Sequence, residues 1–191
     1  MAMAVALSIV GCAPAAVDVP ITYVPQTNVQ QVRGAESVRI DVQIRDARTN
    51  KAEIGAFADP IHTSEITTND NLTDTVKDAV QTELQNRGFK VGAGGPAIVI
   101  DINGLDVRHH VSLFGDKTAR AVMMMHVRVI RKNGDTLYSQ EAAGERGESN
   151  VWYYESVGSP KHFVNLAIQD CIRHLFADPK FIDALLNADN S

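Results

Sequence analysis

Hydrophobic positions along the chain follow two periods, which predict alternating strands and helices. In residues 38–44 every second residue is apolar, which is typical of a strand with one buried face. The same alternation returns in residues 98–111 and 119–129, and a shorter returning strand is predicted at 136–142. Apolar residues recur at helical spacing in two segments, 72–84 and 163–175, which therefore predict amphipathic helices.

Residues that favour particular backbone conformations mark where these elements begin, end or bend. Asn71 is a suitable N-cap for the first helix, and Gly88 can adopt the left-handed conformation that ends it. The pair Asn133-Gly134 predicts a β-hairpin. The alternation in 98–111 changes phase at Asn103-Gly104, which predicts a β-bulge.

The order of elements is β-α-β-β-β-α, which favours an α+β fold. We predict a largely antiparallel sheet of about four main strands, with two main helices packed on one face. This single α+β domain covers residues 35–191, and the length suits one well-buried core. Within it, residues 50–71 give mixed signals, so a hairpin and an irregular excursion both stay open. Residues 12–34 hold three prolines and several amides, and predict a flexible tether.

The first twelve residues combine a short apolar run with a cysteine. Residues 4–10 carry no charge and are shorter than the roughly 20 residues that span a bilayer. The run ends in Ile9-Val10-Gly11-Cys12, which resembles the lipobox of bacterial lipoproteins, although no Lys or Arg opens it. The resemblance implies that residues 1–11 are a signal peptide and that Cys12 is acylated and held by a membrane. Ala13 after the cysteine implies sorting to the outer membrane, with the domain facing the periplasm.

Composition narrows the classes of partner. The net charge is −5 and charged residues make up 21% of the chain, without a strong Lys or Arg cluster. Nucleic acid is therefore not expected as a partner, because phosphate binding needs a concentrated positive surface. The second cysteine, Cys171, has no disulfide partner if Cys12 is acylated, so we expect it to be buried as a small apolar residue.

No catalytic motif is present, and the polar residues form no obvious constellation. His109 and His110 are adjacent in a predicted strand and therefore point to opposite faces, so we predict no metal site and no cofactor. The three carboxylates Asp101, Asp106 and Asp116 show no sign of convergence. An aromatic cluster remains as the candidate partner-binding surface, formed by Trp152, Tyr153 and Tyr154.

The whole layout resembles the YajG family of bacterial lipoproteins. The resemblance rests on the lipobox, the proline-bearing tether, the helix that ends in Arg87-Gly88-Phe89, and the terminal Asp178-Pro179-Lys180-Phe181-Ile182. It implies an outer-membrane lipoprotein of unassigned activity, with no catalytic residues to transfer. Two functions stay open, a non-catalytic module that binds or helps assemble an envelope protein, and an accessory lipoprotein that binds lipid or glycan. A solid core with a flat exposed apolar patch favours the first, whereas a continuous apolar cleft between helices and sheet favours the second.

Overall fold

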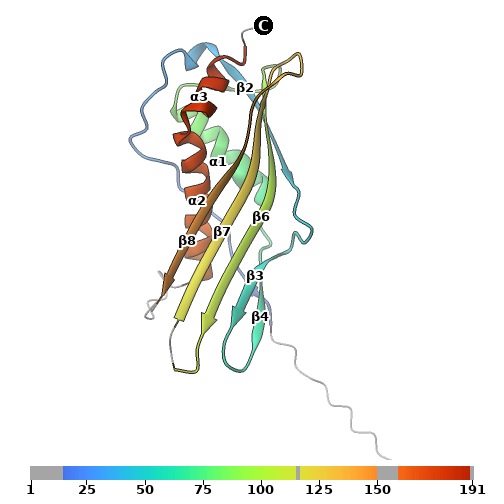
Figure 1. The fold of residues 1–191 in the computed structure, drawn as a ribbon, viewed down its shortest axis with the longest axis vertical. Coiled ribbons are helices and arrows are strands. Elements are labelled where there is room, and N and C mark those ends of the chain that lie inside the picture. The colour runs from blue at the N-terminus through green and yellow to red at the C-terminus, as the bar shows by residue number, and fades with distance from the viewer. Residues whose placement is uncertain (1–14, 115–116, 150–158, 190–191) are drawn as a thin grey trace, which may run out of the picture.

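A computed structural model describes residues 15–114, 117–149 and 159–189 as one sheet covered by helices (Figure 1). Within these residues, eight strands form a single mixed sheet. Their bounds are β1 (Val17–Asp18), β2 (Arg39–Asp46), β3 (Glu53–Ala58), β4 (Thr63–Thr67), β5 (Lys90–Val91), β6 (Ala97–Val111), β7 (Lys117–Ile130) and β8 (Thr136–Ser149). The helices are α1 (Leu72–Asn86), α2 (Pro160–Ala177) and α3 (Pro179–Leu186), with a 3-10 turn η1 (Ala35–Ser37).

The long strand β6 organises the sheet. On one side it pairs along its length with antiparallel β7, which pairs in turn with antiparallel β8. On the other side its first half pairs with β2 and its second half with β3, and both pairings are parallel. Beyond these, β5 is parallel to β2, β4 is antiparallel to β3, and β1 is parallel to β4.

The predicted sheet of about four largely antiparallel strands with two main helices is wrong. In the described residues the sheet has eight strands and four parallel pairings, and there are three α-helices. Strand β3 runs in the same direction as β2 and β6, and the antiparallel strand β4 and then helix α1 return the chain before β5 and β6 begin. Residues 50–71, for which two alternatives were open, contain the hairpin β3–β4. Strand β8 also continues seven residues beyond the predicted end at Ala142.

The local signals agree with the structure. The Asn71 side chain caps α1 by accepting hydrogen bonds from the backbone N–H groups of Thr73 and Asp74, and Gly88 has a φ of 95°. The pairing of β6 with β7 shifts by one residue between Ile102 and Gly104, which confirms the predicted bulge. Along β7, the apolar face predicted from the alternation is buried throughout, and it comprises Ala119, Ala121, Met123, Met125, Val127 and Val129.

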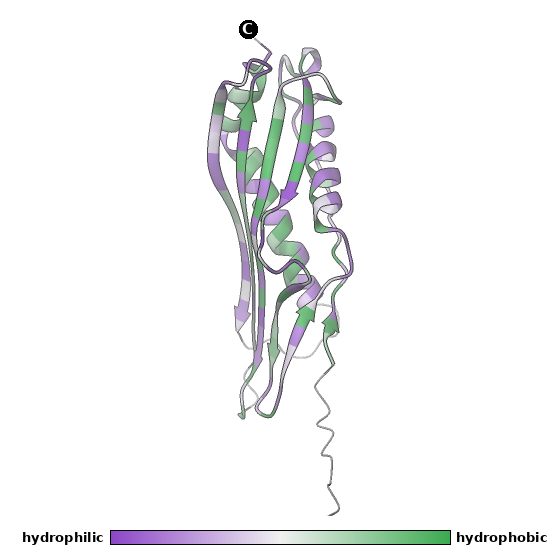
Figure 2. Cartoon of the chain, turned by 90° about the vertical axis from the view of Figure 1, so that its right-hand side faces the viewer, coloured by the Kyte–Doolittle hydropathy of each residue, from purple (hydrophilic) through white to green (hydrophobic). Residues whose placement is uncertain are grey.

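The core lies between the sheet and the helices. Helix α2 packs on β6, β7 and β8, whereas α1 packs on β2 and β5 and also touches α2. Fully buried residues of α2 such as Val164, Ile168 and Ile172 face this layer. Along the strands, hydrophobic and hydrophilic positions alternate, as Figure 2 shows, because one face packs on helices and the other faces solvent.

From Val17 onward, the segment predicted as a tether packs against the domain. After β1, Val19 and Ile21 are only 3% and 5% exposed. Further on, the hydroxyl of Tyr23 donates to the Glu83 carboxylate (2.7 Å). The carboxylate of Glu83 is completely buried and also pairs with Arg87. The alternation of Val19, Ile21 and Tyr23 is a strand-like apolar pattern, and it explains why this proline-bearing segment packs on the domain.

Candidate functional site

The predicted site residues fall largely outside the structure. Cys12 and the cluster Trp152, Tyr153 and Tyr154 lie outside the described residues. Cys171 is described and is fully buried, as predicted, with its thiol donating to the Ala142 carbonyl (3.4 Å). Burial raises the pKa of the Cys171 thiol to about 12, so this cysteine is an inert core residue.

The face of β2, β6, β7 and β8 that no described helix covers, called the open face here, carries a row of polar and charged residues. Four side chains lie side by side across the four strands, in the order Arg45, Asp101, His126 and Glu141. Asp101 is only 8% exposed, although it lies on this face. One of its oxygens accepts from Arg45 Nε (2.8 Å) and the other from Arg128 Nη2 (3.2 Å). Two arginines therefore neutralise and cover one carboxylate.

A serine, a histidine and an aspartate also meet on the open face, as in hydrolases. His126 Nε2 lies 2.9 Å from Ser139 Oγ. Asp101 on β6 lies directly opposite His126, which is on β7. In a catalytic triad the carboxylate orients the histidine, but both oxygens of Asp101 are bound by arginines. The adjacent hollow of about 270 Å³ is lined by Arg45, Asp101 and Arg128 among others, and neither His126 nor Ser139 lines it. This geometry supports a charged surface rather than nucleophilic catalysis.

The other histidines and carboxylates considered from the sequence do not converge. His109 packs on Phe57, with ring centroids 4.9 Å apart, and burial lowers its pKa with help from Lys117. Asp106 pairs with Arg108 (2.9 Å) on the open face, away from Asp101, and Asp116 lies outside the described residues. Across the part of the chain that the structure describes, no group of three His, Cys, Asp or Glu residues could hold a metal ion.

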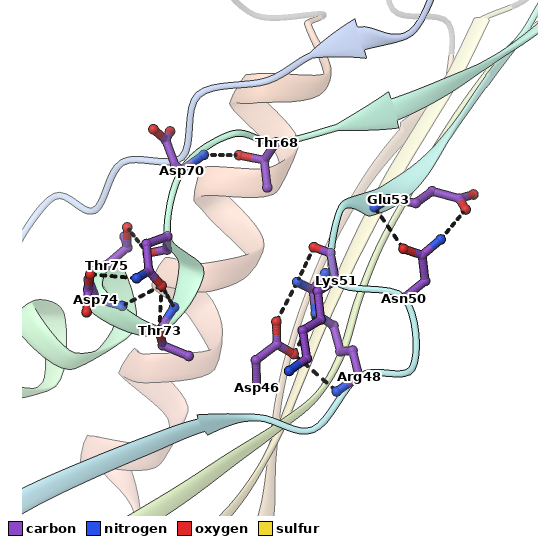
Figure 3. A network of polar contacts seen from close by, with 11 residues as sticks. Asp46, Arg48, Asn50, Lys51, Glu53, Thr68, Asp70, Thr73, Asp74 and Thr75 are labelled. Carbon is purple, nitrogen blue, oxygen red and sulfur yellow. Dashed lines mark hydrogen bonds and ion pairs between the residues drawn. The ribbon is translucent and has the colours of Figure 1, made fainter.

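A second hollow, of about 320 Å³, lies between the β2–β3 connection and the start of α1 (Figure 3). Here the buried Arg48 donates to Asp46 and to the Lys51 carbonyl. Burial raises the pKa of Asp46, but hydrogen bonds from Arg48 outweigh this and hold it below its usual value. Asp70 accepts from the Ile21 backbone N–H (2.6 Å). The two sides of the hollow are bound separately, because Arg48 donates only within the end of β2 and the β2–β3 connection, whereas Asp70 binds the N-terminal segment. The Nη1 atom of Arg48 is buried without a hydrogen-bond partner among the described residues.

The contact between His126 and Ser139 depends on the register of the β7–β8 hairpin. Asn133-Gly134 predicted the hairpin, but near the turn Ile130 pairs with Thr136, and the register shifts between Val129 and Ile130. Only this shift, which the sequence did not indicate, pairs Arg128 with Ser139 and His126 with Glu141. The Asp101 cluster could not be predicted either, because Arg45 reaches it through a parallel pairing whose register no turn fixes.

Comparisons with known proteins place the chain among lipoproteins. A family model described as "Uncharacterized lipoprotein" matches residues 25–185. The solved structure of protein XCC0632 from Xanthomonas campestris, of the family DUF330, is similar over 84% of this chain and 91% of that one, at 10% identity and a TM-score of 0.51. A minor lipoprotein from Acinetobacter baumannii is aligned over 80% of this chain and 95% of its own, at 10% identity and a TM-score of 0.42. No protein with a curated description matches.

Proposed function

We propose, since the chain belongs to the family of uncharacterised lipoproteins, that it is an acyl-anchored protein of the bacterial envelope with a non-catalytic binding domain. In this proposal residues 1–11 are a signal peptide and Cys12 carries the acyl chains. The anchor lies in the outer membrane, and the domain faces the periplasm and binds another envelope protein. The membership agrees with the resemblance to YajG-like lipoproteins.

One feature of the sequence supports the anchor, since Ile9-Val10-Gly11-Cys12 has the residue order of a lipobox. In the described part of the chain, no helix is long and apolar enough to cross a membrane. We expect a secreted form, with a cleavable leader that has no lipobox in place of residues 1–11 and with Ala at position 12, to stay folded and to be released from membranes. The proposal is contradicted if this form fractionates with membranes as completely as the wild type.

The observation that carries the binding role is the composition of the open face. Met124 lies near the middle of the open face and is 45% exposed. Its side chain covers Gly104, where an added Cβ would lie 2.8 Å from the Met124 Cε. Around it lie charged pairs, which include Asp101 with Arg128 and Arg120 with Glu145 (2.7 Å). An apolar centre within a polar rim is the usual anatomy of a protein–protein interface.

The packing of the core supports protein binding over the alternative of lipid or glycan binding. A lipid site would need an apolar cleft between the helices and the sheet. Instead, Ile168 and Ile172 on α2 and Met123 and Met125 on β7 are all completely buried. Side chains fill this layer as in a normal protein interior.

In-cell photo-crosslinking tests the binding role. A crosslinking residue is placed at Met124 on the open face, at Trp152 in the aromatic cluster, and at the exposed Lys77 of α1 as a control. We expect the Met124 or Trp152 position to capture one envelope protein that the Lys77 position does not. We also expect Met124→Glu to reduce capture from a crosslinker at Val122, which lies two residues away on the same face. Identical products from all three positions would contradict the proposal.

A further inference from the structure

Large apolar side chains are exposed at one end of the sheet, in two turns. Ile61 in the β3–β4 turn is 81% exposed, and Leu113 and Phe114 in the β6–β7 turn are 82% and 95% exposed. These are the three most exposed large apolar side chains among the described residues. A single exposed apolar residue is ordinary, but a group of them indicates contact with another apolar phase.

The two turns lie side by side because their strands end together. Strands β3 and β6 are parallel neighbours, and Ala58 lies opposite His110 near the end of both. The turns that follow therefore project from the same edge of the sheet. Figure 1 shows both at the lower end of the molecule, opposite the β7–β8 hairpin.

Cys12, the expected site of the lipid anchor, precedes a strand that the chain enters from this same end of the sheet. Strand β1 runs parallel to β4, with Val17 opposite Ile66, so the chain enters β1 from the side of the β3–β4 turn. Five residues separate Cys12 from Val17, and five separate Ile61 from Ile66. Because five residues span at most about 18 Å, an acyl group on Cys12 can reach the level of Ile61 and not far beyond it.

We propose that the end of the sheet formed by Ile61, Leu113 and Phe114 inserts into the interface of a phospholipid bilayer. The inference rests on the proposed acyl anchor and adds a second contact with the same membrane. Anchor and turns together hold the domain upright, since they meet the bilayer at separate points. The Asn133-Gly134 hairpin then lies farthest from the membrane, and the open face stands clear of the lipid.

The β3–β4 turn is built to present Ile61 to lipid. Asp59 accepts hydrogen bonds from the backbone N–H groups of Ile61 (2.8 Å) and His62 (2.7 Å). The backbone N–H of Asp59 in turn donates to the His62 carbonyl (2.9 Å). These backbone groups are therefore satisfied before contact, which removes much of the cost of moving a turn out of water.

Both arginines on the open face behind the two turns are paired, so we expect the contact to depend on apolar side chains. Arg108 pairs with Asp106, and Arg120 pairs with Glu145, both on the open face. Lipid attraction through unpaired basic residues would need a cluster of Lys or Arg here. We therefore expect insertion into vesicles of zwitterionic phosphatidylcholine, with little dependence on salt or on anionic lipid.

A fluorescent depth measurement tests the insertion. The full acylated chain is purified from membranes and reconstituted into phosphatidylcholine vesicles with a probe at Ile61→Cys or Phe114→Cys. The control probe is at Asn133→Cys in the exposed opposite hairpin. Cys171 is buried and does not take up the label. We expect the probes at 61 and 114 to shift to shorter wavelength and to be quenched by nitroxide-bearing lipid at least about threefold more than the probe at 133.

Two further outcomes separate this inference from the anchor. If the chain floats with the vesicles but the probes at 61 and 114 are quenched no more than the probe at 133, the insertion is refuted and the anchor stands. If the chain does not float at all, both proposals fail. The double variant Leu113→Ser and Phe114→Ser should reduce the quenching of a probe at Ile61→Cys. Its melting temperature should be unchanged, because these side chains contribute no core packing.

Discussion

Gly144 on β8 lies where helix α2 comes closest to the sheet, and Gly144→Ala tests this packing. A Cβ added there would lie 2.2 Å from the Ala167 carbonyl oxygen and 2.3 Å from the Cys171 backbone nitrogen. Both are backbone atoms of α2, so no side-chain rotation can relieve the contact. The whole helix must move away from β8 by about 1 Å to restore ordinary contact distances.

This displacement is costly because α2 carries much of the core. Its inward residues are almost completely buried, and they include Phe163, Val164, Ala167, Ile168, Cys171, Ile172 and Leu175. Overpacking of a core costs about 1–3 kcal/mol, and a backbone contact belongs at the upper end of that range. We expect Gly144→Ala to lower the free energy of unfolding by about 3 kcal/mol, and the melting temperature by about 6–12 °C for a domain of this size.

Urea denaturation followed by circular dichroism measures the effect on the secreted form with Ala at position 12 and without residues 1–11, which needs no detergent. Gly147→Ala is the matched control on the same strand, because its Cβ would lie 3.3 Å from the nearest atom, the Ala119 carbonyl oxygen. The control should change the free energy of unfolding by less than about 0.5 kcal/mol. Equal stability of the two variants would refute the close approach of α2 to β8.

Three more predictions concern buried polar groups. Arg87→Met leaves the Glu83 carboxylate buried without its ion-pair partner, and should lower the free energy of unfolding in urea by about 3–5 kcal/mol; a loss below 1 kcal/mol, roughly, would contradict the pairing. The Cys171 thiol should resist iodoacetamide at pH 8 until the domain unfolds, because burial raises its pKa to about 12, and rapid alkylation of the native domain would show an accessible thiol. Burial also raises the pKa of Tyr23 and of Tyr138, so both stay protonated in the folded state at a pH where they ionise in the unfolded chain. Stability from these tyrosines is present below about pH 10 and is lost as the pH rises further, and absorbance at 295 nm should show that both ionise only as the domain unfolds.

Individual strands and helix ends could be predicted from the sequence because neighbouring residues determine them. Alternation in β7 identified Met123 and Met125 as buried and left Met124 outside, and Asn71 and Gly88 marked the ends of α1. Strand pairing did not follow, because periodicity gives the buried face of a strand but not its neighbour or its direction. The parallel pairs of β6 with β2 and β3 depend on where α1 crosses, which is a property of the whole chain.

Buried charge was the other feature that the sequence concealed. A glutamate is expected on the solvent-facing side of an amphipathic helix such as α1, yet Glu83 is completely buried. Its burial requires three partners that come together only in the fold, Arg87, Tyr23 and the backbone N–H of Gln26. The Asp101 cluster on the open face likewise collects arginines from two other strands. Such sites depend on tertiary register, whereas the lipobox at Cys12 is contiguous and can be recognised from the sequence.

Intact mass spectrometry of the protein extracted from bacterial membranes shows whether Cys12 carries the acyl anchor. We expect a mature chain that begins at Cys12 and carries a diacylglyceryl group and an amide-linked acyl chain on that residue. A membrane-extracted chain that retains residues 1–11 and has an unmodified Cys12 thiol would contradict acyl anchoring.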